Sequence, residues 1–249
     1  MSRPLSLVFA ILCYAIFFAT FLYLIIFVGD LAIASMTSRT VDNPASAMTL
    51  VGAALTDLAL IALFGVQHSV MARQGFKRAW SRFVPAQVER SMYVLISSLA
   101  LIVMFRFWQP INIAIWNVAN PIASDLLWLL FWIGWGLVLV STFLINHFEL
   151  FGLQQAWFHL WGMQGQAPEL REPALYRFVR HPMMLGFFLA FWATPSMSAG
   201  HLLLAAGLTI YILIALHFEE RDLVGLFGAD YENYRSRVGM IFPRFRSRA

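Results

Sequence analysis

Long apolar stretches separated by shorter polar ones dominate this chain. A helix needs about 20 apolar residues to cross the hydrocarbon core of a bilayer. Five stretches meet or approach that length, at 5–28, 49–70, 91–108, 125–146 and 200–218. A sixth, 183–194, is short and runs into the turn-forming sequence TPSMSAG, so it pairs with the last stretch as a helical hairpin. The pattern predicts an all-α, polytopic membrane bundle of five to six helices with a C-terminal hairpin and a cytoplasmic tail.

Composition agrees with a membrane protein. The chain of 249 residues is 60% hydrophobic and only 12% charged, whereas a soluble domain is about a quarter charged. A single cysteine, Cys13, excludes an internal disulfide framework. The first apolar stretch is too long for a cleaved signal sequence, so we expect it to be retained as a span. We expect one transmembrane domain over residues 1–249.

The distribution of Lys and Arg predicts the orientation. If six crossings start from an inside N-terminus, every Lys and Arg except Arg39 and Arg106 falls in an inside segment. Both termini are then cytoplasmic, and a bacterial inner membrane is the expected location. The net charge of +4 indicates a basic inner face near anionic lipid rather than nucleic-acid binding.

Ionisable and amide side chains gather where four of the stretches meet the predicted cytoplasmic side. Such groups are costly at membrane depth and often mark function. They form four sets: Gln67 and His68; Asn146, His147 and Glu149; Arg180 and His181; and Glu219, Glu220, Arg221 and Asp222. Helix ends are also polar simply because water is near. The residue types, His, Asn, Gln and Glu rather than Lys, favour a shared site.

Motifs of other chemistries are missing from the sequence. It has no GxGxxG, no Gly-rich phosphate loop, and neither CxxC nor HExxH, so a nucleotide fold and a zinc site are not predicted. No metal ligands are expected. Haem held by histidines on facing helices stays an open alternative.

Two segments carry a family resemblance. RHPMMLG at 180–186 and EERDLVGLFGADYENYRSRVGMIFP at 219–243 resemble the signature of the isoprenylcysteine carboxyl methyltransferase superfamily. FGVQHSVMAR and NHFELFGLQQ extend the likeness to its methanethiol S-methyltransferase group, which is similar to NnrU-type membrane proteins. One position departs from the pattern, because Met184 stands where the family has Tyr, so that only an apolar contact with the cofactor is available there.

The resemblance implies S-adenosylmethionine as cofactor and a small thiol as substrate. It points to eight cofactor-binding residues: Tyr176, Arg180, His181, Pro182, Gly186, Glu219, Glu220 and Tyr231. Pro182 suits the first turn of a helix, and that helix N-terminus would attract the carboxylate of the cofactor. Gly186 would let the cofactor approach the backbone. Residues 219–249 are expected to cover the cofactor as a cytoplasmic lid.

Thiol methylation benefits from a base, because a free thiol has a pKa of roughly 8.5. His147 is the first candidate and His68 the second, with Asn146 and Gln67 orienting the base or the sulfur. Methanethiol is the expected acceptor, and dimethyl sulfide the product. Alternatives are a prenylcysteine carboxylate, a larger thiol, a non-catalytic haem- or partner-binding role of the NnrU type, and a nicotinamide-dependent reductase. The oligomeric state is not predicted.

Overall fold

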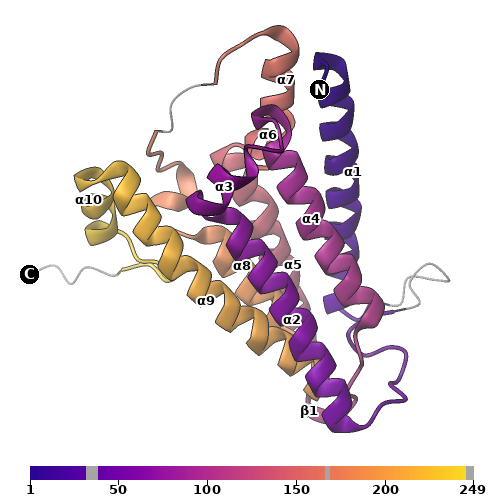
Figure 1. Ribbon diagram of the computed structural model, residues 1–249. Coiled ribbons are helices and arrows are strands. Elements are labelled where there is room, and N and C mark those ends of the chain that lie inside the picture. The colour runs from indigo at the N-terminus through magenta and orange to yellow at the C-terminus, as the bar shows by residue number, and fades with distance from the viewer. Residues whose placement is uncertain (32–38, 166–168, 245–249) are drawn as a thin grey trace, which may run out of the picture. The chain divides into compact units, whose positions relative to one another are not determined.

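The structure is a computed structural model that describes residues 1–31, 39–165 and 169–244 (Figure 1). It is mainly helical, as predicted, with very little sheet. Five of its helices are long and apolar enough to cross a membrane. They are α1 (Arg3–Val28), α2 (Leu50–Ala72), α4 (Ala86–Phe107), α5 (Pro121–Ile145) and α9 (Ala199–Phe227). The chain is therefore an integral membrane protein.

The starts of these helices follow from local sequence. The Thr49 side chain accepts the Gly52 N–H at the start of α2, and the Asn120 side chain accepts the Ala123 N–H at the start of α5. Both are N-cap hydrogen bonds that satisfy a backbone donor the helix cannot. Many apolar side chains are exposed along the helices, such as Val66 at 63%. Lipid contact explains an apolar exterior of this kind.

The sixth predicted stretch forms a helix too short to span. Helix α8 (Pro182–Trp192) has 11 residues, which at a rise of 1.5 Å per residue gives about 16 Å against a hydrocarbon core of about 30 Å. The last predicted span, α9, is longer than predicted. It does not end at 218 but continues to Phe227, and Gly228 with a positive φ of 56° ends it.

By its internal contacts the chain divides into two compact units. Unit 1 comprises 1–117, 147–166 and 196–208, and unit 2 comprises 118–146, 167–195 and 209–249. In unit 1, α4 packs against α1 and α2, and α1 also packs against α7 (Leu153–Trp161). The short helices α3 (Gln74–Trp80) and α6 (His147–Leu150) complete this unit.

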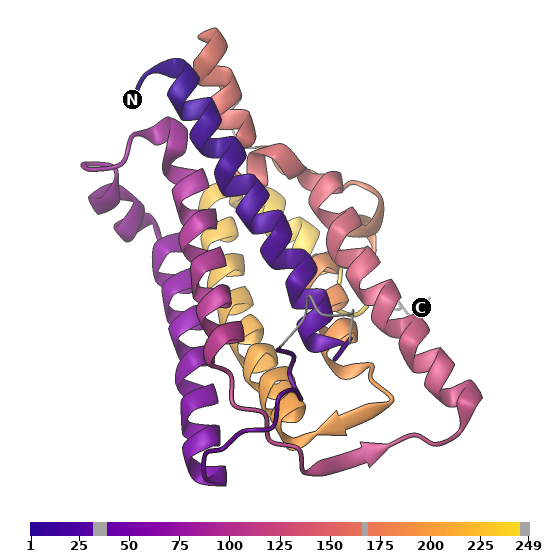
Figure 2. The same ribbon diagram turned by 90° about the vertical axis from the view of Figure 1, so that its right-hand side faces the viewer.

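Unit 1 also contains a small antiparallel ribbon, which the all-helical prediction did not include. Strand β1 (Ala114–Asn117) pairs with β2 (Ser196–Ser198), as Figure 2 shows. The TPSMSAG segment is thus partly extended rather than only a turn. The loop before β1 is also bonded to the start of α9, because the Gly200 N–H donates to Ile111 O at 3.0 Å.

Unit 2 is built on the packing of α5 against α8. A single 3-10 turn (Ala174–Arg177) precedes α8, and the last helix of the chain, α10 (Ala229–Arg237), follows α9. The predicted lid, 219–249, therefore begins inside α9, and its last five residues lie outside the described part of the chain.

Candidate functional site

Two adjacent side chains at the start of α8 and one from α10 meet at one buried carboxylate of unit 2. The Arg180 guanidinium donates from Nε to Oε1 of Glu220 at 2.6 Å, and its Nη2 forms an ion pair with the same oxygen at 2.6 Å. His181 Nε2 lies 3.1 Å from that oxygen, and the Tyr231 hydroxyl donates to it at 3.3 Å. All four residues are at most 8% exposed. We call this set of Arg180, His181, Glu220 and Tyr231 the carboxylate hub.

Backbone hydrogen bonds fix the Arg and His of the hub. Val179 and Gly239 form a parallel β-bridge. The Arg180 N–H donates to Gly239 O at 2.9 Å, and the His181 N–H donates to Met240 O at 3.0 Å. The segment after α10 is thereby tied to the residues that precede α8.

Arg180 also stabilises the C-terminal end of α10. Its Nη1 donates to Arg235 O at 3.2 Å and to the carbonyl of Val238. The last carbonyls of a helix lack intrahelical partners and carry partial negative charge, which a guanidinium offsets. One charged side chain thus joins α9, α10 and the start of α8.

Two further tyrosines lie beside the hub. The Tyr234 hydroxyl donates to the backbone oxygen of Tyr176 at 2.6 Å, and the Tyr176 hydroxyl lies 3.5 Å from Ser141 O. Burial raises the pKa of Tyr234 to about 12 and raises the pKa of Tyr176 further, with the negative charge of Glu219 as the second cause. Both phenols therefore remain protonated donors.

The two adjacent glutamates have different environments. Glu220 is buried in the hub, whereas Glu219 is exposed. Burial and the charge of Glu220 raise the pKa of Tyr231, and Glu219 adds to this shift. Glu219 is thus an acidic group near Tyr176 and Tyr231 that faces solvent, while the carboxylate of Glu220 is already surrounded by donors.

The helix start at RHP forms as predicted, but its glycine has another use. Pro182 occupies the first turn of α8 with His181 as N-cap. The anion beside this N-terminus is the chain's own Glu220. A Cβ on Gly186 would lie 2.6 Å from Gly134 O of α5, so Gly186 allows two helices to touch. Close helix packing is one reason for this glycine, and its role in the approach of the cofactor stays a prediction.

In unit 1, His147 is held by a partner that the sequence did not indicate. Its Nε2 lies 2.8 Å from the Tyr14 hydroxyl, and its ring centroid is 4.9 Å from that of Phe151. His147 is 4% exposed, and burial lowers the pKa of its imidazole below the ordinary 6.5. The ring is therefore neutral at pH 7.

The other predicted base candidate, His68, lies against α4 in the same unit. Ser97 Oγ lies 3.1 Å from His68 Nδ1 and 3.3 Å from Gln67 Nε2. The Tyr93 hydroxyl donates to His68 O at 3.3 Å. The buried Oε1 of Gln67 accepts no hydrogen bond from any of the described residues. Such an acceptor is available to a ligand that donates.

Helix α4 also positions the segment that follows His147. Arg90 Nε donates to Leu150 O at 2.7 Å, and Ser91 Oγ donates to Gly152 O at 3.3 Å. Gly152 has a φ of +87°, and a Cβ there would lie 2.6 Å from the Ser91 nitrogen. Positions 90 to 97 of α4 therefore hold both histidine segments.

Asn146 caps α5 in unit 2, where its N–H donates to Thr142 O at 3.2 Å.

Comparison with known proteins explains the shared motifs. The NnrU protein family matches residues 57–238. This chain belongs to the NnrU family. A methanethiol S-methyltransferase of Mycobacterium tuberculosis is 50% identical over 243 residues, which cover 98% of each chain. Another, of Pseudomonas deceptionensis, is 52% identical over 209 residues, 84% of this chain and 79% of that one. Human Nurim is 34% identical over 176 residues, 67% of this chain and 66% of Nurim. No solved structure matches.

All four hub residues of this NnrU family member lie inside the matched range, but Tyr14 lies before it. Gly239 is a residue that sequence reasoning missed, although its motif was noted. A Cβ on Gly239 would overlap the carbonyl of Phe242, so only glycine fits where the chain crosses residue 179. Across the described residues, no three His, Cys, Asp or Glu side chains are grouped to hold a metal ion.

Proposed function

We propose that this protein transfers a methyl group from S-adenosylmethionine to methanethiol and so forms dimethyl sulfide. The observation that carries the proposal is the similarity to proteins named methanethiol S-methyltransferase, at 45–52% identity over 84–99% of this chain. The hub supports it, because residues of the methyltransferase signature converge on one carboxylate. We place the reaction at the cytoplasmic side of a bacterial inner membrane, in line with the Lys and Arg distribution.

The residues around the hub suit the charges of this cofactor. When bound, S-adenosylmethionine supplies an electrophilic methyl group on a sulfonium, which becomes a neutral thioether as the methyl leaves. Its cationic groups need a carboxylate, and we assign that contact to the exposed Glu219. We assign contacts with its polar groups to Tyr176 and Tyr231, whose phenol oxygens can still accept a hydrogen bond while their protons point to Ser141 O and Glu220 Oε1. Arg180, His181 and Glu220 of the hub, together with Pro182 in the first turn of α8, hold these contacts in place.

The proposed base is His147. As a buried neutral imidazole it can accept the thiol proton, which leaves the thiolate as nucleophile. The Tyr14 hydroxyl, 2.8 Å from Nε2, fixes the orientation of the ring. Phe17 and Phe151, with ring centroids 4.0 Å apart, keep water from this region. A dry surrounding favours a reaction in which a thiolate and a cation neutralise each other. His68, Gln67 and Asn146 remain proposed as groups that orient the acceptor.

The decisive experiment gives purified protein methanethiol and S-adenosylmethionine and measures dimethyl sulfide in the headspace by gas chromatography. We expect product in proportion to protein. Cofactor binding without product would redirect the proposal to a larger thiol or a prenylcysteine carboxylate. The absence of both cofactor binding and product would refute the enzyme assignment. A Soret band in the absorption spectrum would then favour haem binding.

Adjacent glutamates give a matched pair of variants. Glu219→Gln should weaken cofactor binding, measured by calorimetry, with little change in thermal stability. Glu220→Gln removes the charge that Arg180 faces, and breaking a buried pair costs about 3–5 kcal/mol. It should therefore lower the unfolding temperature as well as binding. Equal effects of the two changes on stability would contradict the hub as described.

His147→Ala should abolish turnover and keep cofactor binding. His68→Ala should retain measurable turnover, with weaker apparent affinity for the thiol. Full turnover in His147→Ala would transfer the role of base to His68 or to water.

A further inference from the structure

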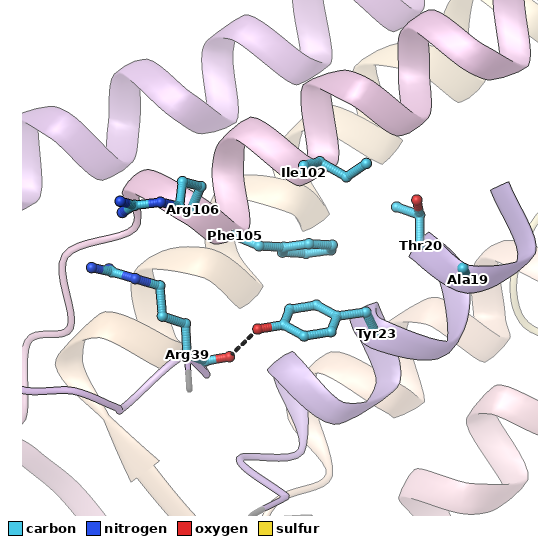
Figure 3. A pocket seen from close by; sticks show the side chains of 7 residues that line it. All are labelled: Ala19, Thr20, Tyr23, Arg39, Ile102, Phe105 and Arg106. Carbon is cyan, nitrogen blue, oxygen red and sulfur yellow. Dashed lines mark hydrogen bonds between the residues drawn. The ribbon is translucent and has the colours of Figure 1, made fainter. Parts of the chain in front are cut away.

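A pocket of about 560 Å³ opens between α1 and α4 of unit 1, and neither His68 nor His147 is among the residues that line it. Figure 3 shows that its walls come from α1, from α4 and from the loop residue Arg39. Two arginines, Arg39 and Arg106, line it. Nothing in the proposed methyl transfer uses this pocket.

The polar atoms of the other walls are already satisfied. The Tyr23 hydroxyl donates to Arg39 O at 2.7 Å, and Thr20 Oγ1 donates to Ile16 O at 2.7 Å. The Tyr23 ring packs on Phe105 with centroids 5.0 Å apart. These two rings and Ile102 therefore form an apolar wall, and the two guanidinium groups are the polar groups left for a ligand.

The two guanidinium groups lie at one end of the pocket, with the aromatic rings beside them (Figure 3). Neither Arg39 nor Arg106 forms an ion pair within the part of the chain that the structure describes. The nearby acids are engaged elsewhere: Asp30 accepts from Asn43 at 3.0 Å, and Asp42 accepts from Ser198. Two cations without a carboxylate indicate a site for an external anion.

The positions of these arginines are also unusual. They are the two basic residues that the predicted orientation puts outside, where Lys and Arg are disfavoured. Both nevertheless line the same pocket. Arg is suited to phosphate because its planar guanidinium donates two parallel hydrogen bonds.

We propose that this pocket binds the phosphate of an anionic phospholipid. The two arginines hold the phosphate, and an acyl chain lies along the apolar wall of Ile102 and Phe105. The ligand must itself be partly apolar, because α1 and α4 are membrane-spanning helices and Ile102 is 41% exposed on the face of α4. Two guanidinium groups beside an apolar wall suit a phosphate that is attached to an acyl chain.

The test uses the full-length protein in detergent, with phosphatidylglycerol, phosphatidylcholine or soluble glycerol 3-phosphate added. Thermal unfolding is followed by Trp fluorescence, and retained lipid is counted by native mass spectrometry. We expect phosphatidylglycerol to bind and to raise the unfolding temperature, phosphatidylcholine to do so less, and glycerol 3-phosphate not at all. Equal stabilisation by glycerol 3-phosphate would show a free-phosphate site and overturn the lipid proposal.

The double change Arg39→Gln with Arg106→Gln should weaken phosphatidylglycerol binding at least about tenfold, the equivalent of about 1.4 kcal/mol. The matched control is Arg78→Gln with Arg82→Gln, which removes the same charge from exposed positions near α3. Equal binding by the two double variants would refute the site. If the first double variant does not fold, Ile102→Trp fills the apolar wall and keeps both charges. It should also reduce lipid binding, and unchanged binding would refute the proposed chain path.

Discussion

The contact between α5 and α8 allows a sharp prediction, because it depends on two glycines that face each other. We predict that Gly134→Ala destabilises the protein. An added Cβ would lie 2.7 Å from Gly186 O and 2.7 Å from the Ala190 nitrogen, both backbone atoms. A backbone cannot rotate away as a flexible side chain can, so the helices must separate or bend.

The size of the effect follows from these distances. Ordinary contact begins at 3.4 Å, so the two backbones must move apart by about 0.7 Å along this line. A close-packed interior accommodates such a change at a cost of about 1–3 kcal/mol. The gain in helix propensity from Gly to Ala, about 1 kcal/mol in water, offsets only part of it. The net expected loss is up to about 2 kcal/mol, or up to several degrees in unfolding temperature for a chain of this length.

Gly136→Ala is the matched control. It lies two residues away on the same helix, and a Cβ there meets nothing within 4 Å. Both variants are compared with the parent protein in one detergent, by thermal unfolding and by SDS titration. Gly136→Ala should equal or exceed the parent in stability. If Gly134→Ala is as stable as Gly136→Ala, the close contact of α5 with α8 is refuted.

Three further predictions concern titration and hydrogen bonds. Burial lowers the pKa of His147, so the unfolded chain takes up a proton near pH 6.5 that the folded protein does not. The free energy of unfolding should therefore fall as the pH drops from about 7 to 5. His147→Gln should flatten this slope when unfolding is measured at several pH values. If His147 is the base, kcat/KM should fall as the pH is lowered, with a midpoint below pH 6.5. Tyr14→Phe should move that midpoint without abolishing cofactor binding. An identical pH profile of kcat/KM in Tyr14→Phe and the parent protein would exclude a positioning role for Tyr14. Tyr234→Phe removes the 2.6 Å hydrogen bond to Tyr176 O and should cost about 1–3 kcal/mol in unfolding experiments, whereas an unchanged unfolding temperature would show that this bond contributes nothing.

The spans could be predicted from sequence because a membrane helix is specified by a long, local property. Each of the five apolar stretches became one helix, with ends within a few residues except in two places. Helix α4 begins at Ala86, five residues before the predicted 91, because Pro85 starts the helix ahead of the apolar run. The ribbon of β1 and β2 was missed because three or four residues are too few to show alternation, and their pairing joins positions more than 75 residues apart.

The candidate residues were easier to name than their partners. A polar side chain next to an apolar stretch can be recognised in the sequence itself, so His147 and Glu220 could be named as candidates. Tyr14 was not, because a tyrosine within the apolar run of α1 looks like any packing aromatic. Its 2.8 Å contact with His147 joins residues 133 positions apart. The packing role of Gly186 was missed, since the sequence contains no sign that Gly134 lies opposite.

The pair Glu219 and Glu220 shows where sequence reasoning ends. Successive residues on a helix point about 100° apart, so only one of two neighbours can face a given partner. The sequence has an acid at both positions, and its periodicity does not say which one faces inward. That choice is made by α10 and the 235–240 segment, which bring Tyr231 and the backbone around Arg180 to the face of Glu220. The buried Glu220 then stabilises the fold, and the exposed Glu219 is left for a cationic ligand. The variants Glu219→Gln and Glu220→Gln distinguish these roles, because the first should weaken cofactor binding and the second should also lower thermal stability.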